Sequence, residues 1–350
     1  TDPAMSSKSL SISMLSAITI AVAAILSTPF LLSIVPLHQI FDGFDPAAIA
    51  GKRVLVCGAS GGLGEQMVYK YAEMGAHIAM VARRKPLLET VAEEARKRGA
   101  ASVTPLVGDM ESESSILDTV STVLDIPAFD GSMDILMLNH ATQYWDWLLP
   151  SLDDLKKERV GRTGDGVSFG FIDAMTRVNF VSFVKLTTLA MPALVRGAAD
   201  AWRLSATSRA KGSSRIIVVS SGGGKLAVPK QAVYSGLKHG LHGFFDSLRL
   251  ELEHKMLPVT ITNVILGTVS TNQFNTATGG DVSWPPPIPA DDAAIGIIRG
   301  GSRGLEELYF PLSQSLHITA ILRPLYGVRW LLDRLTLAMS GGRNVLLSVY

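Results

Sequence analysis

A tyrosine and a lysine one helical turn apart, Tyr234 and Lys238, have the clearest chemical potential in this sequence. If the segment is a helix, the two side chains lie on one face. A cation near a phenol favours the phenolate and so lowers the pKa of the phenol toward the range of proton transfer. Ser221 ends an apolar run upstream, and these three groups around one carbonyl oxygen would supply the proton for a ketone reduction. The alternative interpretation of the pair is a solvated helix face.

A ketone reduction also needs a hydride donor, and a glycine-rich stretch predicts where its cofactor binds. The glycines follow an apolar run typical of a buried strand, and a helical pattern comes next. Glycines permit a tight turn and a close approach to a pyrophosphate, while the helix N-terminus offers free N–H groups. The spacing is Gly-x-x-x-Gly-x-Gly rather than the commoner Gly-x-Gly-x-x-Gly. The residues expected at the dinucleotide are Gly58, Ser60, Gly61, Gly62, Leu63 and Gly64.

The ends of the next two strands predict which dinucleotide binds. Arg83 and Arg84 follow the second strand, where a site for NAD would place a carboxylate on the ribose 2′-hydroxyl. Guanidinium groups instead suit a 2′-phosphate, so we expect NADP(H). Asp109 follows the third strand, where its carboxylate is expected to accept from the adenine amino group, with Met110 beside it.

The elements that must position these residues alternate along the chain. Strands are expected at 53–57, 77–82, 102–107, 135–138, 215–219 and 259–266, and helices at 64–74, 87–98, 169–195 and 232–253. Apolar strands that alternate with helices indicate a parallel sheet covered on both faces. The predicted fold class is therefore α/β, a doubly wound parallel sheet of the Rossmann type in a single domain.

Composition excludes several classes of protein. The chain has 350 residues and a formal net charge of +1, and a nucleic-acid-binding protein would usually show a basic face. Its single cysteine, Cys57, lies in an apolar run, so we expect a buried thiol and no intrachain disulfide. His239 and His242 lie on one helix face without an evident third ligand, so no metal site is expected.

The two ends of the chain differ from the middle. Residues 9–37 carry no charged side chain and are long enough to cross a bilayer as a single N-terminal anchor helix. A cleaved signal peptide and a proline-marked hairpin are the alternatives. The expected divisions are 1–8 for a tag remnant and N-terminal tail, 9–37 for the anchor, 38–50 for a linker, 51–315 for the catalytic domain and 316–350 for an apolar, arginine-punctuated segment. That last segment is expected to lie at a membrane surface or against a dimer partner.

Together these motifs resemble the short-chain dehydrogenase/reductase family, and most of all its 11β-hydroxysteroid dehydrogenase type 1 group. The resemblance is carried by GASGGLGEQMVYKYAEMGAHIAMVARR, LNHAT, VVSSGGGKLAVPKQAVYSGLKHGLHGFF and IIRGGSRGLEELYF. It implies an NADP(H)-dependent enzyme held in the endoplasmic reticulum membrane by an N-terminal span. Plant oil-body relatives share the catalytic domain but use a proline-marked anchor, which keeps a lipid-droplet location open.

The resemblance also implies a role for each site residue. Tyr234 would be the general acid in reduction, with Lys238 lowering its pKa and holding the nicotinamide ribose. Ser221 would bind the substrate oxygen, and Asn179 would hold a water in a proton relay. The remaining residues that the resemblance places at the cofactor are Asn139, Gly267, Val269 and Thr271.

Four positions depart from the family pattern. Leu266 replaces the usual Pro before Gly267, and His140 replaces the second Asn of the common Asn-Asn-Ala-Gly form. Gly61 stands where many NADP-preferring relatives have Lys or Arg, and Val228 stands where steroid-reducing relatives have a tyrosine. The expected function remains a membrane-anchored oxidoreductase that interconverts a ketone and a secondary alcohol on a lipophilic substrate such as a steroid. A homodimer through the Asn179 and Tyr234 helices is also expected. The alternative is a non-catalytic scaffold or lipid-droplet protein that retains the fold.

Overall fold

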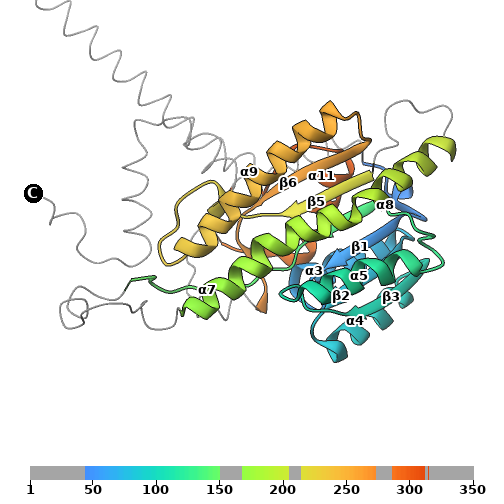
Figure 1. Cartoon of the computed structure of the whole chain (residues 1–350). Helices are drawn as coiled ribbons and strands as arrows, with labels where there is room; N and C mark the ends of the chain where they lie inside the picture. Colours follow the sequence, from blue (N-terminus) through green and yellow to red (C-terminus); the bar gives the residue numbers. More distant parts are fainter. Residues whose placement is uncertain (1–43, 150–167, 205–213, 273–285, 312–313, 315–350) are drawn as a thin grey trace, which may run out of the picture.

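A parallel sheet forms the centre of the computed structural model, which describes residues 44–149, 168–204, 214–272, 286–311 and 314 (Figure 1). Seven strands follow the order β3-β2-β1-β4-β5-β6-β9, and all neighbours run parallel. The strand order reverses between β1 and β4, and such a switch point is where open α/β sheets bind their ligands. The predicted doubly wound sheet is confirmed. The expected anchor at 9–37 and the segment 316–350 lie outside the described residues.

Each of the six predicted strands and four predicted helices overlaps an observed element. The strands are β1 (Arg53–Cys57), β2 (His77–Ala82), β3 (Ser102–Val107), β4 (Ile135–Leu138), β5 (Ser214–Val219), β6 (Val259–Leu266), β7 (Val269–Ser270), β8 (Ile288–Pro289) and β9 (Glu307–Phe310). The helices are α3 (Gly62–Glu73), α4 (Lys85–Lys97), α5 (Glu113–Asp125), α7 (Phe169–Thr176), α8 (Ser182–Leu204), α9 (Ala232–His254) and α11 (Ala290–Ser302). Five strand predictions coincide with β1, β2, β3, β4 and β6, and β5 begins one residue earlier than expected.

The sheet has one apolar core on each face, because successive side chains of a strand point to opposite sides. Val54 and Val56 of β1 join α3, α4 and α11 in one core. Leu55 and Cys57 of the same strand join α5, α8 and α9 in the other. Figure 1 shows α8 crossing the front of the sheet beside α9 and α5.

Five of these helices and strands were not predicted: α5, α11, β7, β8 and β9. Helix α11 contains Gly296, Gly300 and Gly301, which lower its intrinsic helix propensity. Those glycines allow close packing, since a Cβ at Gly301 would lie 2.2 Å from Cδ1 of Ile217 in β5. Tertiary packing therefore stabilises a helix that composition disfavours.

The helix predicted at 169–195 is interrupted and longer than expected. It consists of α7, a π turn at Arg177–Val181, and α8, which continues to Leu204 with Pro192 inside it. Among the described residues, the span Phe169–Ala201 is the one helix long and apolar enough to cross a membrane, and half of its apolar window is buried. Phe183, Leu186 and Leu194 contribute to the core against the sheet, so this is a core helix of the domain.

Candidate active site

The glycine-rich turn joins β1 to α3 at the carboxyl end of the sheet. Gly58 has a left-handed backbone (φ +82°) that favours glycine. A Cβ at Gly64 would lie 2.0 Å from the carbonyl oxygen of Gly58, so the first turn of α3 packs directly on the loop. Gly61 caps α3 without a side-chain hydrogen bond. The free N–H groups of the first helical turn and this close backbone therefore fit a dinucleotide pyrophosphate.

Arg84 lies over the same turn. Its Nη2 donates to the Ser60 hydroxyl at 3.0 Å and to the Ser60 carbonyl at 3.2 Å. A Cβ at Gly61 would lie 3.0 Å from that Nη2, so a glycine at this position leaves room for the guanidinium. Arg84 thus occupies the space into which a basic side chain at position 61 would project. Arg83 is exposed and lies beyond these contacts.

The other residues expected at the cofactor lie at or after the ends of strands, and two of them contact this turn. Asn139, after β4, donates its side-chain amide to the Gly58 carbonyl at 3.2 Å. Thr271 lies against the turn, because a Cβ at Gly62 would be 3.3 Å from its Cγ2. The Asp109 carboxylate accepts from its own loop, at Glu111 N (3.0 Å), beside the buried Met110. Two further residues follow β6 near this edge of the sheet: Gly267 and the buried Val269.

Three of the predicted catalytic side chains converge. The Tyr234 hydroxyl hydrogen-bonds to the Ser221 side chain. The Lys238 Nζ lies 5.6 Å from the centre of the Tyr234 ring and donates to the Val219 carbonyl at 3.0 Å. Gln143, which the sequence analysis did not single out, donates its Nε2 to the Tyr234 hydroxyl at 3.2 Å.

The electrostatics of the pair differ from the expectation. Burial raises the pKa of Tyr234, and hydrogen bonds from Gln143 and Ser221 only partly oppose that shift. Burial also lowers the pKa of Lys238 to about 7. The expected lowering of the Tyr234 pKa by Lys238 is therefore not what the structure shows, because the amine bonds to a backbone carbonyl and lies over the ring rather than at the hydroxyl. The polar contacts of the phenol come from other residues.

Asn179 is buried in the π turn and is held by the backbone of Thr142. Its Oδ1 accepts from Thr142 N at 2.7 Å, and its Nδ2 donates to Thr142 O at 2.7 Å. Its side-chain amide is thus engaged with the loop after β4, next to Gln143. No feature of residue spacing distinguished Gln143. The only available indication was a polar side chain just after a strand end, where functional residues gather.

The loop after β5, which carries Ser221, is fixed by a polar network. Lys225 forms an ion pair with Glu307 of β9, and Tyr309 donates to the same carboxylate at 2.6 Å. His242 of α9 hydrogen-bonds through Nε2 to the Ser220 hydroxyl at 2.9 Å. Burial lowers the pKa of His242 to about 3, with a further contribution from Lys225. His242 is thus a neutral structural residue, and the His239 Nδ1 hydrogen-bonds to the Ser235 carbonyl at 2.8 Å.

His140, another departure from the commonest family motif, is also structural. Its Nε2 hydrogen-bonds to Ser182 Oγ at 2.7 Å, and its ring packs on Phe183. Burial and the charge of Lys238 lower its pKa to about 3, so it is neutral near pH 7. It therefore supports the loop after β4 without acting as a proton donor.

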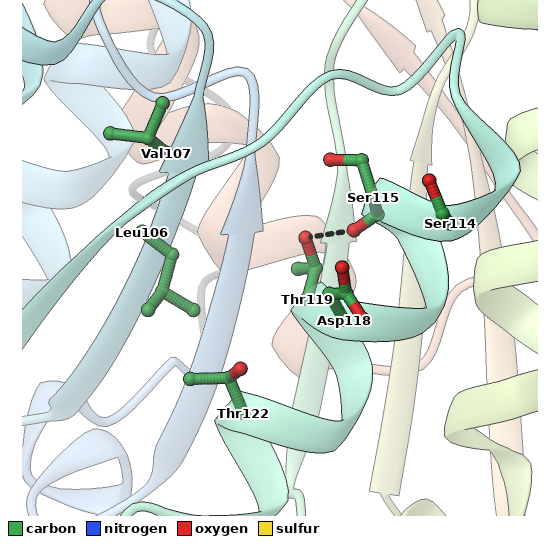
Figure 2. A pocket seen from close by; sticks show the side chains of 7 residues that line it. All are labelled: Leu106, Val107, Ser114, Ser115, Asp118, Thr119 and Thr122. Atoms are coloured by element: carbon green, nitrogen blue, oxygen red, sulfur yellow. Dashed lines mark hydrogen bonds between the residues drawn. The ribbon is translucent and has the colours of Figure 1, made fainter.

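A surface hollow of about 190 Å³ lies beside the cofactor region, between β3 and α5. Figure 2 shows Leu106 and Val107 of β3 facing Ser115 and Thr119 of α5. Ser115 Oγ accepts from Asp109 N at 2.8 Å, so the hollow adjoins the predicted adenine loop. None of the predicted site residues lines the hollow itself.

The chain belongs to the short chain dehydrogenase family, because the model of that family matches residues 52–280. A hydroxysteroid 11-beta-dehydrogenase 1-like protein of Gallus gallus is 35% identical over 274 residues, which is 77% of this chain and 82% of that protein. A protein of the same description from Macaca fascicularis is 32% identical over 290 residues, covering 83% and 86% of the two chains. The protein is thus an oxidoreductase of this family, whose members bind a nicotinamide cofactor.

Solved structures share the fold. The 3-ketoacyl-(acyl-carrier-protein) reductase from Brucella melitensis, complexed with NADH, has a TM-score of 0.60 at 20% identity and covers 75% of this chain and 97% of its own. A short-chain dehydrogenase from Sphingobium yanoikuyae, in complex with NADPH, has a TM-score of 0.60 at 18% identity, with coverages of 81% and 95%. At these identities the likeness concerns the fold alone.

Proposed function

We propose that this protein is a membrane-anchored, NADP(H)-dependent oxidoreductase that interconverts a ketone and a secondary alcohol on a lipophilic substrate, a steroid or a related lipid. The observation that carries the proposal is the apolar surrounding of the Tyr234 hydroxyl. Tyr144, Met175 and Tyr234 form a small buried cluster of their own. Five partly buried apolar residues pack against it: Leu148, Phe171, Ile172, Val233 and Leu237.

Exposed apolar residues lie close to members of this cluster in the sequence. In the chain, Trp147 and Leu149 flank Leu148, and Phe169 lies two residues before Phe171; these three side chains expose 44%, 67% and 68% of their surfaces. Exposed large apolar side chains near a reactive group are typical of a surface that receives an apolar ligand. A substrate whose carbonyl oxygen reaches Tyr234 would therefore bury hydrocarbon against these side chains, which favours a lipid over a sugar or a charged metabolite.

The catalytic residues suit carbonyl reduction and its reverse. The nicotinamide cofactor supplies the hydride when bound. Tyr234 gives its proton to the carbonyl oxygen, and Ser221, which bonds to the same phenol, orients that oxygen. Burial of Lys238 places its pKa at about 7, so this amine can exchange a proton near neutral pH.

Arg84 supports NADP(H) as the preferred form. Its guanidinium is held over the turn by Ser60, where it can bind a ribose 2′-phosphate through charge-assisted hydrogen bonds. We expect Arg84→Ala to raise the KM for NADPH about 10- to 100-fold and to leave the KM for NADH nearly unchanged. Arg303→Ala, which removes an exposed arginine beyond α11, is the matched control. Equal effects on the two cofactors would contradict the assignment.

The proposal also includes a membrane anchor, a cellular location and a homodimer. The relatives that carry the hydroxysteroid 11-beta-dehydrogenase 1-like description support a steroid or similar substrate. We place the anchor at 9–37, the catalytic domain at 51–315 and the protein in the endoplasmic reticulum membrane, with a homodimer through α8 and α9. A substrate dissolved in a bilayer is reached directly by an enzyme anchored at its surface. Fractionation of the full chain, before and after carbonate extraction, tests the anchor.

A substrate panel tests the reaction. The full-length protein is incubated with NADPH and with steroid, retinoid, long-chain aliphatic and small polar ketones, and NADPH oxidation is followed. We expect turnover of at least one of the three lipophilic classes and its loss in Tyr234→Phe. Tyr71→Phe is the matched control, because the Tyr71 hydroxyl is buried in α3 without a hydrogen-bond partner among the described residues. Turnover of small polar ketones alone, or activity retained in Tyr234→Phe, would refute the proposal.

A further inference from the structure

We propose that Gln143 is a further catalytic residue, whose side-chain amide donates to the Tyr234 oxygen and stabilises the phenolate that proton transfer leaves behind. The two groups are in contact, with the Nε2 of Gln143 3.2 Å from the Tyr234 hydroxyl. The proposal rests on the oxidoreductase activity of the site and adds a residue to its machinery.

The chemistry of the step requires a donor at this position. In reduction, the phenolic O–H bond breaks and its proton passes to the substrate oxygen as hydride reaches the carbonyl carbon. The Tyr234 oxygen then carries the negative charge. A carboxamide N–H does not ionise, so Gln143 remains a donor before and after the transfer. It also occupies a lone pair of the neutral phenol, which directs the O–H toward the substrate.

The loop after β4 holds Gln143 between two fixed neighbours. Thr142 is clamped on one side by both polar atoms of the Asn179 side chain, each at 2.7 Å. On the other side, the Tyr144 hydroxyl accepts from Val233 N at 3.2 Å, in the first turn of the helix that carries Tyr234. The loop that carries the donor is thus tied directly to α9, the helix that carries the acceptor, which lowers the entropic cost of keeping the two groups aligned. Asn179 acts here as a positioning residue for Gln143.

Other groups around the phenol do not replace this donor. Lys238 of α9 directs its Nζ to the Val219 carbonyl, and His140 after β4 is neutral and bonds to Ser182. Among the described residues, Lys238 lies over the Tyr234 ring and Tyr144 packs in the same buried cluster. Ser221 bonds to the phenol from the loop after β5, but its hydroxyl is also needed at the substrate oxygen. Burial raises the pKa of Tyr234, and Gln143 is first among the hydrogen-bond donors that oppose the shift.

Kinetics of Gln143 variants test the proposal. Gln143→Leu removes the donor, and Gln143→Glu replaces it with an acceptor of nearly the same shape. We expect Gln143→Leu to lower kcat for ketone reduction about 10- to 100-fold, as for loss of one hydrogen bond to a charged group. In alcohol oxidation, which needs the phenolate, the pH at half-maximal rate should rise by about one unit in Gln143→Leu and further in Gln143→Glu.

Two controls make the outcome decisive. Gln66→Leu makes the same exchange on α3, away from the phenol, and should leave kcat and the pH profile unchanged. Gln143→Asn keeps the amide on a shorter side chain and should recover part of the rate. An unchanged pH profile in Gln143→Leu, with a folded protein, would overturn the proposal.

A second measurement does not depend on the substrate. Tyrosinate absorbance is titrated in the full-length protein and compared with Tyr234→Phe to isolate the ionisation of Tyr234. We expect this ionisation to move to higher pH in Gln143→Leu. A shift in the titration without turnover of any ketone would leave the role of Gln143 standing and refute only the proposed substrate class. No shift would refute the role of Gln143 itself.

Discussion

The turn after β1 and the loops after β4 and β5 meet at the same edge of the sheet, but different forces hold them. The turn is held by close backbone packing: a Cβ at Gly58 would lie 2.7 Å from the Cα of His140, and one at Gly64 would lie 2.0 Å from the Gly58 carbonyl oxygen. The two loops are held by side chains, through the Asn179 clamp and the Lys225–Glu307 ion pair.

This difference follows from what each region must bind. A pyrophosphate is recognised by backbone N–H groups, so the chain must come close and a side chain would be in the way. A carbonyl that accepts hydride and a proton needs a few polar groups at defined positions in an apolar surrounding. The turn should therefore be damaged by adding atoms, and the loops by removing polar atoms.

The largest effect is expected from adding one methyl group to the turn. Gly64→Ala places a Cβ 2.0 Å from Gly58 O and 2.7 Å from Asn139 Nδ2, and neither neighbour is free to move. We expect a loss of about 4 kcal/mol or more in the free energy of unfolding, together with loss of cofactor binding. Denaturant unfolding and NADPH fluorescence titration measure both.

Gly243→Ala is the control for this change. Gly243 lies within α9, and a Cβ there meets nothing within 4 Å. The exchange should stabilise the protein by about 0.4–1 kcal/mol. Equal stabilities of the two variants would break the comparison, since the turn would then tolerate added atoms like an open helix face.

The same contrast explains what the sequence could predict. Strands β1, β2 and β4 were located residue by residue because strands buried on both faces form continuous apolar runs. The turn was identified because its backbone geometry requires glycine at fixed spacing. Helix α11 was missed because its glycines serve packing against Ile217 and Leu308, which only the assembled sheet reveals.

Hydrogen bonds between catalytic residues and distant parts of the same chain could not be predicted from the sequence. Tyr234, Lys238 and Ser221 could be named from spacing and resemblance, and the structure brings them together. The bond of Gln143 to Tyr234 joins residues far apart in the chain and depends on a loop with no regular secondary structure. The π turn that buries Asn179 likewise gives no pattern in the sequence.

Lys238→Met, a change near the catalytic tyrosine, is expected to have a smaller effect of opposite sign, because it should raise the free energy of unfolding. The folded pKa of Lys238, about 7, lies below its ordinary value of 10.5. Between these values the unfolded chain binds more protons, so the free energy of unfolding of the wild type rises with pH. We expect the variant to be more stable by about 2 to 3 kcal/mol at pH 7, after allowance for the lost bond to Val219, and to be inactive.

Chemical denaturation across pH 6 to 11 measures this difference, which should narrow as the pH rises from about 7 to about 10. A stable but inactive variant would show that the loops keep a costly buried amine for catalysis. A variant less stable than the wild type at pH 7 would mean that the Lys238 hydrogen bond to Val219 outweighs the cost of burying the amine.

The smallest effect on the free energy of unfolding is expected from weakening the charge network that holds the loop after β5. An exposed ion pair serves as the comparison. Glu307→Gln weakens the bonds to Lys225 and Tyr309 and should lower the free energy of unfolding by about 1 to 2 kcal/mol at pH 7. Glu89→Gln, which removes one member of the exposed pair Lys85–Glu89, should change it by less than about 0.5 kcal/mol.

The free energy of unfolding at acid pH shows whether the charge of Glu307 causes the difference between the wild type and Glu307→Gln. Burial acts to raise the pKa of Glu307, but its bonds to Lys225 and Tyr309 outweigh burial and hold the pKa below its ordinary value of 4.5. The stabilisation is therefore present above pH 4.5 and is lost as the pH falls through the folded pKa, where wild type and Glu307→Gln should converge. A constant difference down to pH 2 would locate the effect in packing rather than charge. The loop that carries Ser221 would then be held by contacts like those of the glycine turn.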